Sequence, residues 1–443
     1  MQSILKINAF DSNHSSVSDA SILELIKRRE RSFGADAPLF YANPLHVVRG
    51  QGVWLYDSDG RPFLDAYNNV PHVGHCNPDV VEAVARQAAT LNTHTRYLSE
   101  QSYAYAEQLL ETFPAPLSKL SLTCTGTESV DLAMRMAYKY TGGTGFIVTR
   151  FAYHGNSVAV SSISPSVGLA VPVGRDVRLV AAPDSYRHPQ PSIAGRLAEQ
   201  VSAAIDDLEQ HGVKLAAMII DSIFSSDGVY TDPPGFLQSA AARVRMAGGL
   251  VIADEVQPGF GRTGTHMWGF QRHALIPDIV VMGKPMGNGI PIGGVVTTPE
   301  ILKAFAGSAG YFNTFGGNGV SCAAGHAVLN VLRRDNLLQN ATDVGGYLKR
   351  QLQAVAGVHE CIGDVRGAGL YLSVEFVTQR DTREPDAPKA AAVINALRNR
   401  GVLVGGTGAH ANMLKIRPPL VFSRENADLL VLALDDILRT GGE

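Results

Sequence analysis

The chain has 443 residues, of which 45% are hydrophobic, and a formal net charge of −3. This length and apolar content suffice for two domains with a large buried core, and the slightly acidic balance argues against a nucleic-acid partner. Because no apolar leader and no run near the ~18 residues of a membrane helix is present, we expect a cytoplasmic protein without membrane contact. The four cysteines form no C-x-x-C pair, so neither a metal site nor a disulfide framework is expected.

The N-terminal part of the chain predicts an arm followed by a hairpin. Residues 1–20 are polar and rich in Ser, Asp and Asn, which favours a loose arm. Two apolar runs, at residues 53–56 and 62–64, flank the segment Asp57-Ser58-Asp59-Gly60. Asp-Gly turn chemistry between two such runs predicts a β-hairpin.

The middle of the chain alternates short apolar runs with helical periodicity. Such runs are typical of strands that are buried on both faces of a parallel sheet. They occupy residues 146–148, 215–220, 250–253 and 279–282, and helical stretches alternate with them, for example at residues 129–140. Alternating strands and helices predict an α/β sheet with right-handed crossovers.

The C-terminal part changes to a helix, strands near residues 370–376, and helices near residues 389–400 and 425–438. We therefore expect a large α/β domain with a mostly parallel central sheet, and a small α+β domain built from both chain ends. The predicted division places an N-terminal arm and part of the small domain at residues 1–70. The large domain would cover residues 71–330, and the rest of the small domain residues 331–443.

Reactive side chains stand where the predicted strands end, which is where open α/β sheets bind their ligands. Asp221 and Asp254 follow two of these runs, and Lys284 follows a third after one glycine. A lone lysine is normally a solvated surface group. Lys284, however, lies between a buried strand and the glycine-rich segment at residues 285–289. Burial lowers the pKa of a lysine and makes it a nucleophile suited to a Schiff base.

Two neighbouring features complement this lysine. A carboxylate at Asp254 could keep a pyridinium nitrogen protonated, although capping of a helix is an alternative role for it. The segment at residues 125–129 precedes the predicted helix, and a helix N-terminus offers free amides to a phosphate. An ordinary capped helix is the alternative there. Tyr153 could stack on a flat ring or belong to the core, and we interpret His72 and His75 as loop residues rather than metal ligands.

Taken together, these residues resemble the class III (fold type I) pyridoxal-phosphate aminotransferase family. The carrying segments are Ile-Ala-Asp-Glu-Val-Gln-Pro-Gly-Phe-Gly-Arg-Thr-Gly at residues 252–264 and Gly-Lys-Pro-Met-Gly-Asn-Gly at residues 283–289. The resemblance extends from about Arg49 to the C-terminus. It implies that the cofactor is pyridoxal 5'-phosphate, held as a Schiff base on Lys284.

The resemblance also assigns roles to matching positions. Lys284 would shuttle protons, Asp254 would pair with the pyridine nitrogen, and Gln257 would contact the ring hydroxyl. Tyr153 would cover a ring face with His154 beside it, and Gly126 with Thr127 would bind the cofactor phosphate. Thr314 would reach the phosphate of a neighbouring subunit, which implies a homodimer or a tetramer with shared active sites.

One departure from the family pattern concerns the substrate. Many family members carry an arginine for a substrate carboxylate three residues before a double proline, and this chain has Lys415 there. Lysine lacks the planar fork of arginine, so carboxylate binding would fall to Arg417 if it occurs. A smaller departure places Thr125 and Ser129 around Gly-Thr-Glu in the phosphate loop, which leaves the amides in place.

A closer resemblance links residues 66–78 and 91–98 to the ethanolamine-phosphate phospho-lyases. It implies β-elimination of phosphate from O-phosphoethanolamine, a small phosphorylated amine, giving acetaldehyde, ammonia and phosphate. Asn68, Asn69 and Arg96 are the candidates for the substrate phosphate, together with Lys415 and Arg417 for the substrate as a whole; Arg96 could instead form a surface salt bridge. The alternatives are an aminotransferase that uses a keto-acid acceptor and a non-catalytic protein of the same fold.

Overall fold

The computed structural model describes residues 3–11, 17–34, 38–168, 170–188, 192–307 and 310–441. Its centre is a seven-stranded sheet in the order β4-β10-β9-β8-β7-β5-β6. The strands from β9 to β6 run parallel, whereas β10 is antiparallel to both of its neighbours. The mostly parallel sheet is therefore confirmed. The strand bounds are β4 (Lys119–Thr123), β5 (Gly145–Thr149), β6 (Val177–Val180), β7 (Leu215–Asp221), β8 (Leu250–Asp254), β9 (Ile279–Met282) and β10 (Gly293–Thr297).

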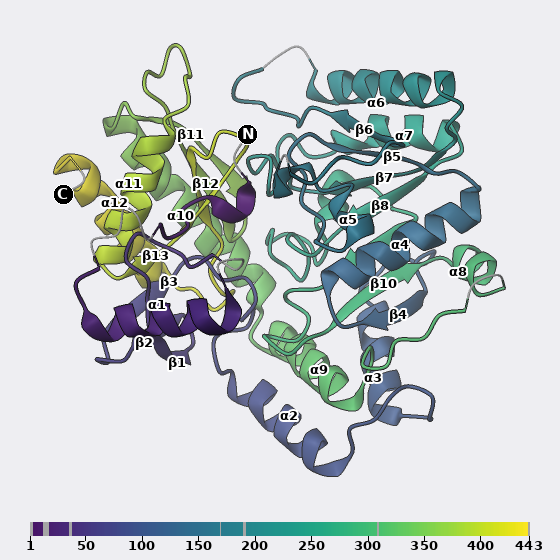
Figure 1. Ribbon diagram of the computed structural model, residues 1–443, viewed down its shortest axis with the longest axis horizontal. Helices are drawn as coiled ribbons and strands as arrows, with labels where there is room; N and C mark the ends of the chain where they lie inside the picture. The colour runs from purple at the N-terminus through teal and green to yellow at the C-terminus, as the bar shows by residue number, and fades with distance from the viewer. Residues whose placement is uncertain are drawn as a thin grey trace.

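Helices cover both faces of this sheet (Figure 1). Phe146 and Val148 of β5 pack into one apolar cluster with α4 (Gly126–Thr141) and α8 (Pro299–Ala306). Ile147, between them, packs into a second cluster with α6 (Ile193–Gln210) and α7 (Leu237–Met246). Because successive side chains of a strand point to opposite faces, both faces of β5 are apolar, which explains its unbroken apolar run.

The two chain ends meet in a second sheet of order β1-β2-β3-β13. The predicted hairpin is formed by β2 (Trp54–Asp57) and β3 (Pro62–Asp65), with β1 (Val47–Gln51) beside it. β13 (Val402–Leu403) pairs parallel with β3. A third sheet has the order β11-β12-β15-β14, with β11 (Ile362–Ala368), β12 (Tyr371–Phe376), β14 (Gly405–Thr407) and β15 (Met413–Ile416). Figure 1 shows the purple N-terminal and yellow C-terminal elements on one side of the molecule; the boundaries at residues 70 and 330 remain a prediction.

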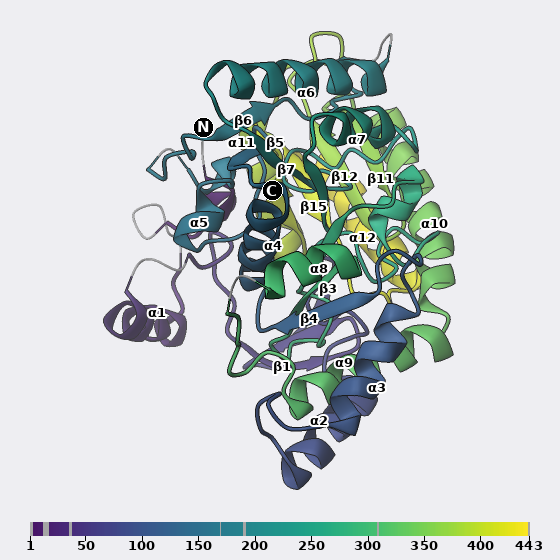
Figure 2. The ribbon, with the colours of Figure 1, turned by 90° about the vertical axis from the view of Figure 1, so that its right-hand side faces the viewer.

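The remaining helices surround these sheets. α2 (Pro78–Thr90) and α3 (Glu100–Leu110) pack against α9 (Gly319–Arg334) at one end of the molecule (Figure 2). α10 (Leu337–Val358), α11 (Ala387–Asn399) and α12 (Arg424–Arg439) lie around the third sheet, and α1 (Ala20–Phe33) and α5 (Val158–Ser161) complete the set. No helix of the described residues is long and apolar enough to cross a membrane.

The expected loose arm is wrong for the part of residues 1–20 that the structure describes. A short 3-10 helix spans Ile4–Lys6, and Asn8 accepts a hydrogen bond from the amide of Gly406 at 3.1 Å. Ile7 is buried, and a Cβ placed on Gly406 would lie 2.1 Å from its Cγ2. The arm is therefore anchored because Gly406 leaves space for an apolar side chain that lies within a polar stretch. Residues 1, 2 and 12–16 of the expected arm lie outside the described residues.

Candidate active site

The carboxyl ends of the parallel strands bring the predicted reactive groups together. Asp221 of β7 is in register with Asp254 of β8, and Asp254 is in register with Val281 of β9. Lys284 follows β9 after Gly283. Adjacent strands of a sheet lie about 4.8 Å apart, so the two carboxylates and the lysine face one space at the edge of the sheet.

Asp254 is a buried carboxylate held by two contacts. One oxygen lies 2.6 Å from Nδ1 of His154, which is also buried, and the other accepts the amide of Val256 at 3.1 Å. A turn, not a helix, follows β8, so the helix-cap alternative for Asp254 is wrong. The backbone of His154 is itself fixed, because its amide donates to Ser164 Oγ at 3.0 Å. Asp254 is therefore a preorganised acidic group at the floor of the site.

Lys284 carries an amine prepared for nucleophilic attack. Burial, followed by the positive charge of Arg417, lowers its pKa from 10.5 to about 8, although Asp254 and Asp221 oppose this shift. Among the described residues, its amine has no hydrogen-bond partner. The lowered pKa makes the neutral, nucleophilic form of this amine more accessible, which is what Schiff-base chemistry requires.

The start of α4 forms a cradle for an anion. Thr125 caps the helix by accepting the amide of Glu128 at 3.1 Å, whereas the amides of Gly126 and Thr127 donate to no group within the described part of the chain. The hydroxyl of Thr127 lies 3.2 Å from Asn156 Oδ1. A Cβ on Gly283 would lie only 3.1 Å from the Cα and the amide nitrogen of Gly126. The lysine-bearing segment and the helix start thus approach each other so closely that a side chain larger than that of glycine would be crowded at residue 283.

A polar network borders the opposite side of the site. Gln257 Oε1 accepts from Asn69 Nδ2 at 2.8 Å and from Arg417 Nη1 at 2.5 Å. Arg417 also donates to Asn69 Oδ1 at 2.9 Å, and its guanidinium lies 4.6 Å from the centre of the Tyr67 ring. Asn68, next in the chain, donates instead to Asp65 Oδ2 at 3.0 Å. Gln257, expected at the cofactor ring, and Asn69 and Arg417, expected at the substrate, therefore form one hydrogen-bonded group.

Three further predicted residues differ in their surroundings. Lys415 is buried on β15, and burial, then Arg417 and Lys284, lower its pKa well below the ordinary value. By contrast, Arg96 and Thr314 are exposed. The guanidinium of Arg96 lies 4.0 Å from the centre of the Phe312 ring. These two residues share a surface formed by residues 94–98 and 310–318 and do not line the site of their own chain.

Tyr153 is half-buried, and burial together with the charge of Asp254 raises its pKa. The loop that carries Tyr153 and His154 depends on Asp227, a residue that sequence reasoning missed. Asp227 accepts from the hydroxyl of Thr149 at 2.7 Å and from the amide of Phe151 at 3.2 Å. Burial raises its pKa to about 7. No pattern in the sequence marks it, since it follows Ser-Ser in a loop that is far from Thr149 along the chain.

Glu255 is the acid that follows Asp254 in the chain, and the sequence assigned no role to it. Its oxygens accept the amides of Gly269 at 2.7 Å and Phe270 at 2.9 Å, and the hydroxyl of Ser222 at 3.0 Å. Burial raises the pKa of Glu255 to about 8. Since every contact stabilises a loop, Glu255 has a structural role, and of these two adjacent acids it is Asp254 that faces the site.

His72 and His75 are loop residues with structural partners. His72 is buried, with Nε2 lying 2.6 Å from the carbonyl of Phe260 and Nδ1 3.0 Å from Arg262. His75 lies 2.6 Å from Asp65. The described residues contain no group of side chains that could hold a metal ion.

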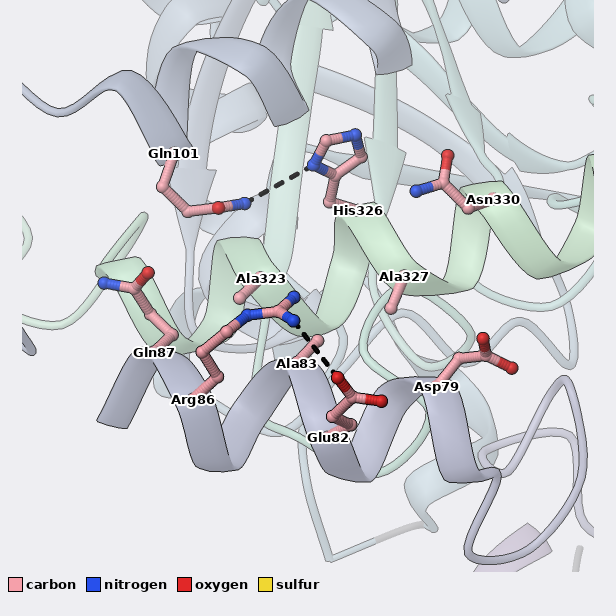
Figure 3. A pocket seen from close by; sticks show the side chains of 10 residues that line it. All are labelled: Asp79, Glu82, Ala83, Arg86, Gln87, Gln101, Ala323, His326, Ala327 and Asn330. Atoms are coloured by element: carbon pink, nitrogen blue, oxygen red, sulfur yellow. Dashed lines mark hydrogen bonds and ion pairs between the residues drawn. The ribbon is translucent and has the colours of Figure 1, made fainter. Parts of the chain in front are cut away.

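A separate pocket of about 420 Å³ lies between α2, α3 and α9 (Figure 3). Its contacts are an ion pair of Arg86 with Glu82 at 3.2 Å and a contact of Gln101 with His326 at 3.4 Å. Figure 3 shows these side chains on the facing helices α2, α3 and α9, with neither Lys284 nor Asp254 among them. This pocket therefore belongs to the helical end of the molecule and not to the site at the sheet edge.

The groups at the sheet edge fit pyridoxal phosphate. Lys284 offers an amine for the aldehyde, Asp254 a buried carboxylate for the ring nitrogen, and Gln257 an amide for the ring hydroxyl. The free amides of Gly126 and Thr127 suit the phosphate. A side chain at Gly283 would crowd the start of the helix, so glycine at this position keeps the lysine-bearing segment close to the free amides.

Comparisons with known proteins agree with this geometry. The family model described as aminotransferase class-III matches residues 40–438. An alanine–glyoxylate aminotransferase 2-like protein of Drosophila melanogaster is 41% identical, covering 94% of this chain and 87% of that protein. An ethanolamine-phosphate phospho-lyase homologue of Caenorhabditis elegans is 39% identical, covering 94% and 93%. The structure of a phospholyase from Arthrobacter in complex with phosphoethanolamine is 44% identical, with a TM-score of 0.90 and coverage of 94% of this chain and 99% of that chain.

Proposed function

The chain belongs to the class-III aminotransferase family of pyridoxal-phosphate enzymes, and we propose that it is a phospho-lyase acting on O-phosphoethanolamine. The observation that carries the proposal is the similarity to the Arthrobacter phospholyase, which is 44% identical over 99% of that chain. The products would be acetaldehyde, ammonia and inorganic phosphate, formed with the uptake of one water molecule.

The residue at one substrate-binding position of this chain supports phosphate elimination over amino transfer. Relatives of both kinds have similar identities, 41% for the aminotransferase-like protein and 39% for the phospho-lyase homologue. The position where many aminotransferases of the family carry a carboxylate-binding arginine is Lys415. Phosphoethanolamine has no carboxylate, and therefore does not need the bidentate contact that lysine cannot make.

Each residue of the site would have a separate role in the reaction. When bound, the cofactor supplies an electron sink for the carbon that carries the substrate nitrogen. Asp254, oriented by His154, would keep the ring nitrogen protonated, which strengthens that sink. The neutral amine of Lys284 would remove the proton from this carbon as a general base. The electron pair left on that carbon would form a double bond to the next carbon as the carbon–oxygen bond breaks and phosphate departs. Water would then release acetaldehyde and ammonia.

The phosphate of the substrate would need cationic or hydrogen-bonding partners. Asn68, Asn69, Lys415 and Arg417 would act from the same chain. Arg96 would act from a neighbouring subunit, because it lies on the same exposed surface as Thr314. The active form would accordingly be a homodimer, in which Thr314 reaches the neighbour's cofactor phosphate.

A direct comparison of the two activities tests this function. We expect the kcat/KM for phosphate release from phosphoethanolamine to exceed that for amino transfer from alanine to glyoxylate at least about 100-fold, a difference of about 2.7 kcal/mol in transition-state stabilisation. Phosphate and glycine would be measured with the same enzyme preparation. If amino transfer is the faster reaction, the protein is an aminotransferase.

A further inference from the structure

Two cations stand close together here, Lys415 on β15 and Arg417 just after the end of this strand. Because side chains of an extended chain alternate, Lys415 points away from its neighbours Leu414 and Ile416, which pack into the apolar core. Lys415 is in register with Ser373 of β12 on one side and with Gly405 of β14 on the other. A Cβ on Gly405 would lie 2.2 Å from Cε2 of Tyr67, so Tyr67 adjoins the same face.

These two cations differ in whether they have partners. Arg417 is committed to Asn69 and Gln257 at 2.9 and 2.5 Å. Lys415 is only 5% exposed, and its amine has no hydrogen bond or ion pair within the described residues. The neighbouring Ser373 is fully buried, and its hydroxyl has no partner among the described residues either. In the described part of the chain, a buried amine without a partner thus lies beside a buried hydroxyl without a partner.

The nearby carboxylate does not supply the missing partner. Asp221, the acid that acts on Lys415 electrostatically, accepts the amides of Ile223 and Ser225 at 3.0 Å each and also the hydroxyl of Ser225. The positive charge of Arg417 acts on both Lys284 and Lys415, and that of Lys284 acts on Lys415. A buried charge without a partner is costly for folding. A lysine in this place is therefore better explained by the binding of an anionic ligand than by a contribution to the stability of the fold.

We propose that Lys415 is the anchor for the phosphate group of the substrate, with Ser373 positioning its amine. This inference rests on the proposed function and names the residue that determines specificity for a phosphate. Lys284 must stay free to move a proton, and Arg417 can add only those donors that Asn69 and Gln257 leave unused. Lys415 is therefore the cation whose donors are all available to the phosphate. An ammonium offers three donors to a tetrahedral dianion and needs no planar partner.

Calorimetric titration of the cofactor-loaded enzyme with inorganic phosphate, and then with phosphoethanolamine, tests this role. We expect Lys415→Met to weaken the binding of both ligands about 10- to 100-fold, as is typical for the loss of a hydrogen bond to a charged group. Ser373→Ala should weaken it about 3- to 10-fold. Lys139→Met, which removes an exposed lysine from α4, is the matched control for loss of one charge and should bind phosphate as the wild type does.

Unchanged phosphate affinity in Lys415→Met would overturn the assignment. If thermal unfolding shows that this variant is not folded, unchanged affinity in Ser373→Ala would overturn it instead. A failure of the proposed function looks different. In that case the wild type binds phosphate through Lys415 but releases none from phosphoethanolamine. If only the anchor is wrong, release from phosphoethanolamine proceeds with the same KM in wild type and Lys415→Met.

Discussion

At the scale of single residues, burial gives Lys284 its reactivity. Burial and Arg417 bring its pKa from 10.5 to about 8, so the neutral form is half populated near pH 8 rather than near pH 10.5. Uptake of pyridoxal phosphate by the cofactor-free enzyme should therefore rise about tenfold per pH unit below pH 8 and level off above it. The visible band of the bound cofactor, followed in a stopped-flow instrument, measures this rate.

Two outcomes would contradict this account of Lys284. A rate that continues to rise to pH 10 would mean that the amine is an ordinary solvated lysine. Borohydride reduction followed by peptide mapping provides the control, and should place the pyridoxyl group on Lys284. A label on a different lysine would remove the assignment altogether.

Asp254 is predicted to act through its charge. Asp254→Asn keeps the shape of the side chain but removes the partner of a protonated ring nitrogen. We expect the rate of phosphate release to fall by about two to four orders of magnitude, as for the loss of comparable electrostatic or orienting groups. Circular dichroism should show an unchanged fold. A rate close to that of the wild type would show that Asp254 only fastens the turn to Val256.

Asp221, Asp254 and Lys284, the reactive residues that were identified without the family resemblance, share one property, which is their position at or just after the end of an apolar strand. Lys284 and Asp254 could be predicted because parallel strands end at the same edge of a sheet. Asp227 could not, since its contacts with Thr149 and Phe151 join segments that are distant in the sequence. Arg96 was grouped with the substrate phosphate from its motif, and only the fold places it on an exposed surface.

At the scale of elements, the close approach of β9 and α4 is the feature most sensitive to substitution. A methyl group at Gly283 would meet the backbone of Gly126 at 3.1 Å, and backbone cannot move aside as a side chain can. Gly283→Ala should therefore separate Lys284 from the anion cradle and weaken cofactor retention about tenfold. Dialysis followed by absorbance of the retained cofactor measures this loss.

Gly357→Ala is the matched control for that experiment. Gly357 lies in α10, and a Cβ there would have no neighbour within 4 Å. Alanine stabilises a helix interior by roughly 0.5–1 kcal/mol relative to glycine, so cofactor retention should be unchanged. Equal cofactor retention in Gly283→Ala and the wild type would show that the Gly283 segment and the start of α4 do not need this close approach to hold the cofactor.

Prediction of the elements succeeded for four strands that are buried on both faces and have unbroken apolar runs. The apolar runs of β5, β7, β8 and β9 were apparent for that reason. β10 is buried as well but was missed, because two glycines leave it only Val295 and Val296 as an apolar run. β4 and β6 were missed because they are the two edges of the sheet, and their part-exposed faces carry Lys119 and Arg178. Pairing of β13 with β3 joins residues far apart in the sequence, and no local pattern specifies the partner of so short a strand.

At the scale of the whole molecule, the proposed homodimer would bury exposed apolar side chains that lie around Thr314. Leu98 is 92% exposed, Phe315 70% and Tyr97 65%. Grouped exposed apolar side chains of this kind mark interaction sites. We expect the wild type to sediment as a homodimer, and Leu98→Asp to shift it toward monomer with a loss of activity. Leu432→Asp, at a 66% exposed position on α12, should leave both unchanged, and a fully active monomer would refute the shared site.

The central proposal for the whole molecule is that its site eliminates phosphate rather than transferring an amino group. The most direct measurement mixes the cofactor-loaded enzyme with phosphoethanolamine in the absence of any keto acid and counts the products per active site. Elimination regenerates the enzyme in every cycle, so phosphate, acetaldehyde and ammonia should appear in equal amounts over many turnovers. If the enzyme instead stops after one turnover with its cofactor aminated, and resumes only when a keto acid is added, the central claim is wrong.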